Sequence, residues 1–152
     1  MKLAILLLSA TCVLSTASAQ AQSRYSYSTD GSEVTDSQTG LVWRRCAEGM
    51  AWSGSTCSGT TATYSHEQAL ARARTQAGWR LPSVKELGSI VDRSRSNPAI
   101  DVAAFPATSS SWFWSSSPYA GNANRAWFVY FGHGHVDPGA HRIDNFAVRL
   151  VR

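Results

Sequence analysis

Two cysteines, Cys46 and Cys57, constrain the fold of this chain more than any other feature of its sequence. The third cysteine, Cys12, lies inside an N-terminal segment that has the pattern of a cleaved export signal. An exported chain meets an oxidising environment, in which two cysteines usually pair. Closing a loop of about a dozen residues would stabilise the fold by roughly 3 kcal/mol in the chain-entropy model. The alternatives are two free thiols or a metal site, although two thiolates alone do not complete a zinc site.

The export signal is predicted over residues 1–19. Lys2 supplies the positive charge, residues 3–14 are largely apolar, and Ala17-Ser18-Ala19 has the small-x-small pattern of a cleavage site. The apolar stretch is shorter than the about 20 residues that a membrane-spanning helix needs. We therefore expect a signal peptide cleaved after Ala19, export to the periplasm or the extracellular space, and no stable membrane insertion.

The mature chain is mildly basic, and its basic side chains are almost all arginine. Without Lys2, 13 of the 14 basic side chains remain against 10 acidic ones, which gives a net charge of +3. The arginines are scattered and form no basic stripe, so we expect no nucleic-acid partner. Arginine favours bidentate contact with carboxylate, sulfate or phosphate, which favours an anionic ligand. The alternative is an ordinary solvated surface with an arginine bias.

The N-terminal half contains the predicted helices. Residues 20–32 are expected to form a short leader with a brief strand at Tyr25–Tyr27, and a strand over 41–46 enters the core. Residues 47–63 are rich in Gly, Ser and Thr, which predicts a loop that the disulfide ties down. Two capping boxes then predict two helices. They are formed by Ser65 with Gln68 and by Ser83 with Glu86.

The C-terminal half is predicted to be strand-rich. Aromatic and β-branched residues over 125–131 and alternation over 146–151 indicate two strands, with a hairpin or bulged loop over 132–139. The whole order predicts an α+β domain over residues 33–152, with two helices packed on an antiparallel β-sheet. A further hypothesis is that the first and last strands pair, which would bring the termini together.

Four segments, in this order, make the chain resemble the Lcl C-terminal domain family, long described as a domain of unknown function. They are Val34-Thr35-Asp36 with Thr39 to Trp43, Gly78 to Pro82 with Glu86-Leu87, Trp112 to Ser116, and Val148 to Arg152. The resemblance covers essentially all of residues 33–152. It implies a C-type-lectin-like fold and an exported, often surface-associated protein. The namesake domain ends a collagen-like adhesin, forms trimers and binds sulfated glycosaminoglycans. No Gly-x-y tract occurs here, so trimerisation is not carried over and the oligomeric state stays open.

The candidate ligand contacts are aromatic and arginine side chains. Trp43, Trp79, Trp114 and Trp127 lie within or beside the family motifs, so we expect them to build the core. Trp52, Tyr64 and Tyr119 are predicted to lie in loops and are the better aromatic contact candidates. Arg125 and Arg142 belong to the strand-rich half, where strand residues whose side chains point to the same face of the sheet could form a patch for anionic groups.

The sequence does not favour a metal or calcium site. His133, His135 and His141 could hold zinc or copper, but their flanking glycines argue against a preorganised site. The Glu-Pro-Asn and Trp-Asn-Asp strings typical of sugar-binding calcium sites do not occur. We therefore expect no cofactor, and the three histidines stay weak candidates for a metal site.

Catalysis is not indicated. The resemblance also implies a likeness in shape to the formylglycine-generating enzyme, whose active-site cysteine pair would be expected in the C-terminal half. Cys46 and Cys57 lie outside that half. No Gly-x-Ser-x-Gly, His-Glu-x-x-His or P-loop motif occurs. The chain is therefore interpreted as an exported, non-enzymatic module that binds a glycan, sulfated or not, or an envelope or host protein. The alternatives are a structural or accessory envelope protein and a metal-binding protein that uses the His133, His135 and His141 loop.

Overall fold

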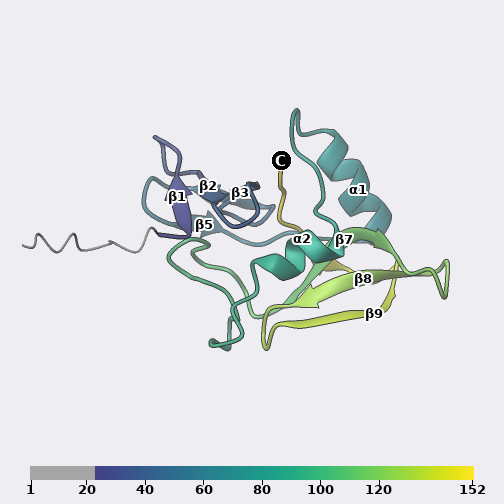
Figure 1. Ribbon diagram of the computed structural model, residues 1–152. Coiled ribbons are helices and arrows are strands. Elements are labelled where there is room, and N and C mark those ends of the chain that lie inside the picture. Colours follow the sequence, from purple (N-terminus) through teal and green to yellow (C-terminus); the bar gives the residue numbers. More distant parts are fainter. Residues whose placement is uncertain (1–22) are drawn as a thin grey trace, which may run out of the picture.

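A computed structural model describes residues 23–152, so the predicted signal peptide and the first residues of the leader lie outside the described part of the chain. Within residues 23–152 the chain folds into two short helices and three β-sheets (Figure 1). The first small sheet consists of β1 (Tyr25–Tyr27), β2 (Glu33–Asp36) and β3 (Val42–Arg44). The second is the hairpin of β4 (Met50–Trp52) and β5 (Cys57–Gly59). The large sheet has the order β6-β10-β7-β8-β9. Its strands are β6 (Thr63–Tyr64), β7 (Trp112–Pro118), β8 (Arg125–Tyr130), β9 (His135–His141) and β10 (Phe146–Ala147), and the helices are α1 (His66–Arg74) and α2 (Val84–Ser89). The α+β prediction is confirmed.

Both predicted capping boxes are formed. The Ser65 hydroxyl accepts from the backbone N–H of Gln68, and the Gln68 side chain accepts from the backbone N–H of Ser65. Ser83 and Glu86 make the same reciprocal pair at the start of α2. Such boxes satisfy amides that a helix leaves without partners, so a short local pattern suffices to place the helix start.

The two helices cover opposite faces of the large sheet. Phe113 and Trp114 are neighbours on β7, so their side chains point to opposite faces. Phe113 packs in a core cluster with Leu87 of α2 and with Ile90, the C-cap residue of that helix. Trp114 packs in a second cluster that includes the α1 residue Ala69. Of the expected core tryptophans, Trp43 and Trp114 are fully buried, whereas Trp79 and Trp127 are half-buried.

The predicted disulfide joins Cys46 to Cys57, with their Cα atoms 5.4 Å apart. The segment over 47–63, expected to be a loop, instead contains the hairpin of β4 and β5, in which Trp52 pairs with Cys57. Each strand has only three residues, which is too short for alternation to be visible in the sequence. Gly49 permits the entry into β4, because it has a φ of +89° and a Cβ there would lie 2.5 Å from the backbone nitrogen of Ala62.

The first and last segments of the domain lie side by side, as hypothesised. Val42 and Arg152 exchange backbone hydrogen bonds of 2.9 Å, and Trp43 lies opposite Val151. The strand predicted over 146–151 is shorter than expected, because only Phe146–Ala147 stays in the large sheet. The remaining residues leave that sheet and run beside β3, which places the C-terminus between β3 and α1 (Figure 1).

The brief strand predicted at Tyr25–Tyr27 is formed as β1, and it pairs with β2 in the first sheet. One further segment differs from the prediction. Residues 135–139, expected to lie in a hairpin or bulged loop over 132–139, instead belong to strand β9. Pro138 and Gly139 fit this strand because β9 is at the sheet edge, next to an irregularity in its register with β8.

Arg149 is fully buried and joins three parts of the chain. Its guanidinium donates to the carbonyls of Arg44 and Arg45 and, at 2.8 Å, to the hydroxyl of Thr108. The aromatic ring of Phe105 lies 5.0 Å from its guanidinium carbon. None of the carboxylates described over 23–152 forms an ion pair with it. Burial lowers the pKa of Arg149 to about 9, so the side chain is still charged at neutral pH.

We expect Arg149→Ala to lower the free energy of unfolding by about 3 kcal/mol or more, because it leaves a cavity and buried acceptors without a donor. The matched control is Arg93→Ala, which removes an exposed arginine and should change stability by less than about 0.5 kcal/mol. Chemical denaturation of both variants measures the difference. Equal stabilities would show that Arg149 does not hold these segments together.

We expect the double variant Cys46→Ala, Cys57→Ala to be less stable than the wild type by roughly 3 kcal/mol, because the unfolded chain regains the freedom that the closed loop removes. Chemical denaturation gives the change in stability. Intact mass checks the bond itself, since the oxidised protein is two hydrogens lighter than the reduced one. An unshifted mass on reduction would contradict the disulfide.

Candidate functional site

Three segments meet at one end of the large sheet and form a hollow there, which we call the Arg142 pocket. The backbone N–H of Arg142 donates to the carbonyl of Asn124 in the β7–β8 loop, and that of His66 donates to the carbonyl of Arg142. These two bonds, each 2.9 Å, fix the turn after β9 against the loop and against the start of α1. The pocket has a volume of about 520 Å³. It is lined by Ser65, Glu67, Ala123, Asn124, His141, Arg142 and Ile143.

The guanidinium nitrogens of Arg142 differ in how closely they are held. Its Nε donates to Nδ1 of His66 at 3.2 Å, and one terminal nitrogen donates to the carbonyl of Ala123 at 3.4 Å. The other terminal nitrogen lies 3.6 Å from the carboxylate of Glu67, whose side chain is 82% exposed. The short contact is thus at Nε, and the two terminal nitrogens make only long contacts.

His66 provides the support for Arg142. It is the first residue of α1, it is buried, and its Nε2 lies 3.0 Å from the carbonyl of Ser115. Its ring also packs edge-on against Trp114, with centroids 5.2 Å apart. Burial lowers the pKa of His66, and the nearby charge of Arg142 lowers it further. The neutral ring then donates from Nε2 to Ser115 and accepts from Arg142 at Nδ1.

The five predicted ligand contacts are only partly brought together. Arg142 lines the pocket, and Arg125 lies beside it, with a terminal nitrogen 3.5 Å from Nε2 of His141 and another donating to the carbonyl of Gly139. Tyr64 is half-buried in β6, where it packs against the second core cluster. Tyr119 packs edge-on against Trp127 at 6.1 Å. Neither tyrosine lines the Arg142 pocket.

Trp52 lies in a second hollow, which we call the Trp52 pocket. This pocket has a volume of about 280 Å³ and adjoins the disulfide. It is lined by Ser32, Glu33, Arg44, Cys46, Ala47, Glu48, Met50, Trp52 and Trp79. Trp79 was expected in the core, but it is half-buried and forms a wall of this pocket.

The three candidate histidines are not gathered into one site. His135 and His141 are the two ends of β9, a seven-residue strand, so about 20 Å separates them at about 3.3 Å per residue. His133 lies in the preceding turn and packs against Tyr130. Over residues 23–152, no group of three or more His, Cys, Asp or Glu side chains is placed to hold a metal ion. The three histidines therefore do not form a single ligand set.

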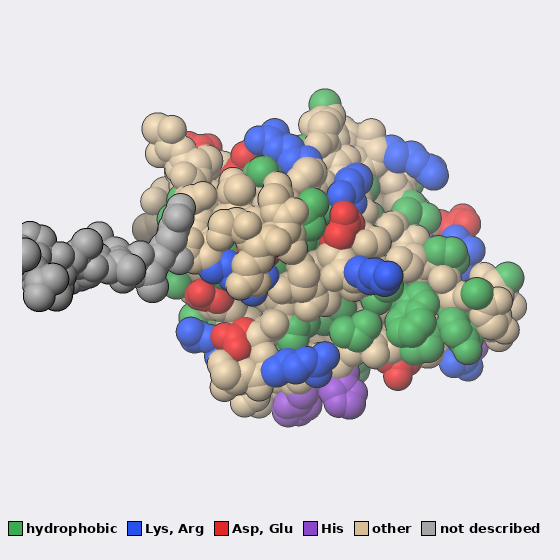
Figure 2. All heavy atoms as spheres, in the orientation of Figure 1, with side chains coloured by type: hydrophobic (Ala, Val, Ile, Leu, Met, Phe, Trp, Pro, Cys, Tyr) green, Lys and Arg blue, Asp and Glu red, His purple; other side chains and the backbone are tan. Residues whose placement is uncertain are grey.

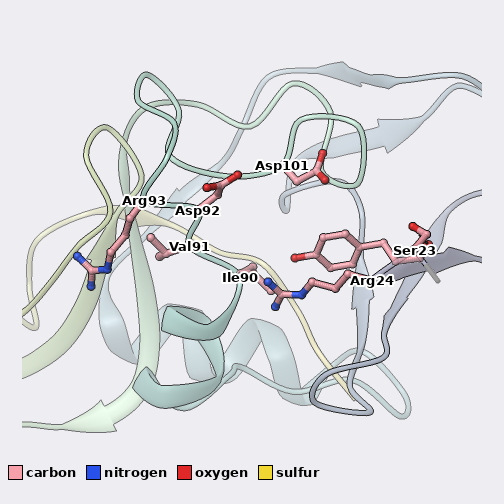
Figure 3. A pocket seen from close by; sticks show the side chains of 8 residues that line it. Ser23, Arg24, Ile90, Val91, Asp92, Arg93 and Asp101 are labelled. Carbon is pink, nitrogen blue, oxygen red and sulfur yellow. Dashed lines mark hydrogen bonds between the residues drawn. The ribbon is translucent and has the colours of Figure 1, made fainter. Parts of the chain in front are cut away.

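A third hollow, of about 550 Å³, lies between β1 and the segment after α2 (Figure 3). Arg24 approaches it from one side, Asp92 and Asp101 approach from the other, and Tyr25 also lines it. Three of its charged groups have partners within the protein. Arg24 binds Asp36 at 2.6 Å, Asp92 binds Arg95 at 2.8 Å, and Asp101 accepts from the backbone of Ala103. Arg93 also lines the hollow and is exposed.

Several residues of the two pockets were not predicted from the sequence. Ile143 is 83% exposed at the rim of the Arg142 pocket, and Asn124 lines it, but neither carries a sequence signal. His66 follows the N-cap Ser65 directly, so the capping box could have located it at a helix start.

On the face in Figure 2, basic and acidic side chains are interspersed. No helix within residues 23–152 is long and apolar enough to cross a membrane.

The fold and these sites define a small α+β domain with one disulfide and solvent-open pockets. The chain belongs to the Lcl C-terminal domain family, whose sequence pattern matches residues 32–152. The resemblance noted from the four motifs is thereby confirmed. No curated protein and no solved structure matches the chain.

We expect the stability of the protein to fall as the pH drops below the ordinary histidine pKa of 6.5, because the unfolded chain then takes up a proton that His66 in the native state does not. The loss continues until the pH reaches the lowered native pKa. Denaturation at a series of pH values measures it, and His66→Gln should flatten the dependence in this window. An NMR titration that places the pKa of His66 at or above 6.5 would contradict the assignment.

Proposed function

We propose that this chain is an exported, non-enzymatic binding module that recognises a glycan through acidic groups, sulfate or carboxylate, at the Arg142 pocket. The observation that carries the proposal is the way Arg142 is held. His66 fixes its Nε, while its terminal nitrogens have only the long contacts to Ala123 and Glu67. A guanidinium positioned in this way is prepared for a bidentate anion, which forms two parallel hydrogen bonds.

The present partner of Arg142 is a weak competitor for such an anion. The Glu67 side chain is 82% exposed, and exposed ion pairs contribute little because water and salt screen them. Arg125 and His141 add hydrogen-bond donors next to the pocket, and the Asn124 amide and Ser65 hydroxyl offer polar contacts within it. Ile143 adds an exposed apolar surface at the rim, against which the C–H groups of a sugar can pack.

The disulfide supports export, because disulfides persist in oxidising compartments. We also infer a C-type-lectin-like fold, as the family resemblance implies. The feature that supports this inference is the pairing of β3 with the last residues of the chain, which closes the domain into a loop. Periplasmic and extracellular locations are both compatible with this proposal.

We expect Arg142→Gln to weaken binding to sulfated polysaccharides by about 10-fold to 100-fold, the equivalent of losing about 1.5–3 kcal/mol of hydrogen bonding to a charged group. A glycan array of residues 20–152, run with and without chelator, identifies the ligand for this measurement. Wild-type binding should resist chelator and weaken with added salt. Arg74→Gln is the matched control, because Arg74 is an exposed arginine on α1 away from the pocket. Salt-independent binding, or equal affinities of the two variants, would contradict the proposal.

A second candidate function is that of an accessory envelope protein that acts through protein contacts. One observation favours it: Trp112 is 47% exposed although it stacks between Tyr130 and Phe146, with centroids 5.3 and 5.7 Å away. Exposed aromatic side chains are common at the centre of protein interfaces. The test is chemical cross-linking of the wild type and of Trp112→Ser in the envelope. This function is favoured over the first if the wild type binds no glycan and the variant loses a protein partner that the wild type cross-links.

A further inference from the structure

The Trp52 pocket is built from parts of the chain that only the fold brings together. Its walls come from β2, from residues 44–48 after the start of β3, from β4 and from Trp79 after α1. Its volume of about 280 Å³ lies just below the roughly 300–1,000 Å³ that is typical of pockets for drug-sized ligands. The pocket therefore has room for one ring rather than for an extended chain.

The Trp52 ring is held in place before any ligand arrives. Its Nε1–H donates to the carbonyl of Asp30 at 2.9 Å, and the guanidinium carbon of Arg45 lies 4.2 Å from its ring centroid. Its backbone pairs with Cys57, which the disulfide ties to Cys46. A side chain fixed in this way loses little further freedom on binding, which favours affinity.

The Trp79 ring is held by two arginines. The guanidinium carbon of Arg44 lies 4.9 Å from its centroid, and that of Arg152 lies 4.8 Å away. Arg44 is itself bound to Glu48 at 3.1 Å and to Gln76 at 3.0 Å. The pocket thus offers two fixed indole rings that are still partly open to solvent.

The charges around the pocket are already paired. Glu48 binds both Arg44 and Arg72, and Glu33 binds Arg152 at 2.6 Å. A charged ligand would find no free counter-charge among these groups. An organic cation is disfavoured further, because the guanidinium groups beside both indole rings already supply positive charge there. The pairing therefore favours a neutral ligand.

We propose that the Trp52 pocket binds a single neutral pyranose ring, which places its C–H groups against the parts of Trp52 and Trp79 that are open to solvent beside the arginines. Aromatic rings provide the apolar contact for such faces. The sugar hydroxyls can donate to the carboxylate of Glu33 and accept from the Arg44 guanidinium, both of which are partly exposed. This site is separate from the Arg142 pocket, and it takes a neutral ring instead of an acidic group.

NMR of the 15N-labelled indole groups tests this proposal in the wild-type protein of residues 20–152. The probes are the methyl glycosides of glucose, galactose and N-acetylglucosamine, with methyl glucuronide and choline as charged comparisons. We expect at least one neutral glycoside to shift the indole Nε1–H signals of Trp52 and Trp79 in a saturable way, while Trp112 stays unchanged. No saturable shift with any neutral glycoside, or shifts with choline or glucuronide alone, would overturn the proposal.

Two variants locate the site and separate this proposal from the function proposed above. Trp52→Leu should weaken the binding of the glycoside at least tenfold, whereas the control Trp112→Leu, at an exposed tryptophan on the large sheet, should leave it unchanged. Denaturation checks that both variants stay folded. The NMR shifts of the wild-type protein test the proposal even if a variant does not fold. Arg142→Gln should keep the indole shifts even if it loses sulfated polysaccharide. Equal loss on Trp52→Leu and Trp112→Leu would contradict the assignment of the pocket.

Discussion

The buried guanidinium of Arg149 is the interaction on which the rest of the domain depends. It comes from the last strand-like segment of the chain and donates to the backbone at Arg44 and Arg45 and to the side chain of Thr108. A charge without water must find several hydrogen-bond acceptors, so its presence requires these segments to lie together. The same contacts hold the C-terminal residues beside β3. Much of the irregular chain between α2 and β7 is therefore ordered by polar contacts as well as by apolar packing.

Arginine side chains that bind other parts of the chain and also border a pocket recur in this structure. Arg45 donates to the carbonyls of Ala103 and Ala104 and lies over the Trp52 ring, so it positions a wall of one pocket. Arg142 uses its Nε on His66 and directs its terminal nitrogens into the other pocket. A planar guanidinium with five donors can do both, because one edge binds the protein while another edge or face is left for a second contact. The arginine bias of the sequence thus serves packing and, in the function proposed above, recognition as well.

Local signals in the sequence were reliable where their cause is local. The two helix starts follow from Ser65 and Ser83 and their partners three residues later, because a capping box needs only one turn of chain. The disulfide followed from the number of cysteines left in an exported chain. The β4–β5 hairpin was missed because its strands are held by the disulfide and by Gly49 rather than by an alternating pattern. Strand β9 was missed because Pro138 and Gly139 indicate a turn, and only the edge position of the strand permits them.

The sequence alone determined the α+β class, the capped helices, the cysteine pair and the family, since each rests on short-range patterns or on motifs in a fixed order. It also named Arg125, Arg142 and Trp52 as surface candidates. Only the tertiary structure decided that Arg142 and Trp52 belong to different pockets, that Trp79 faces solvent beside Trp52, and that His141 lies far along β9 from His135. These outcomes depend on strand register and on contacts between residues far apart in the chain. A pattern along the sequence does not show such contacts, because they form only when buried groups such as Arg149 meet partners from distant parts of the chain.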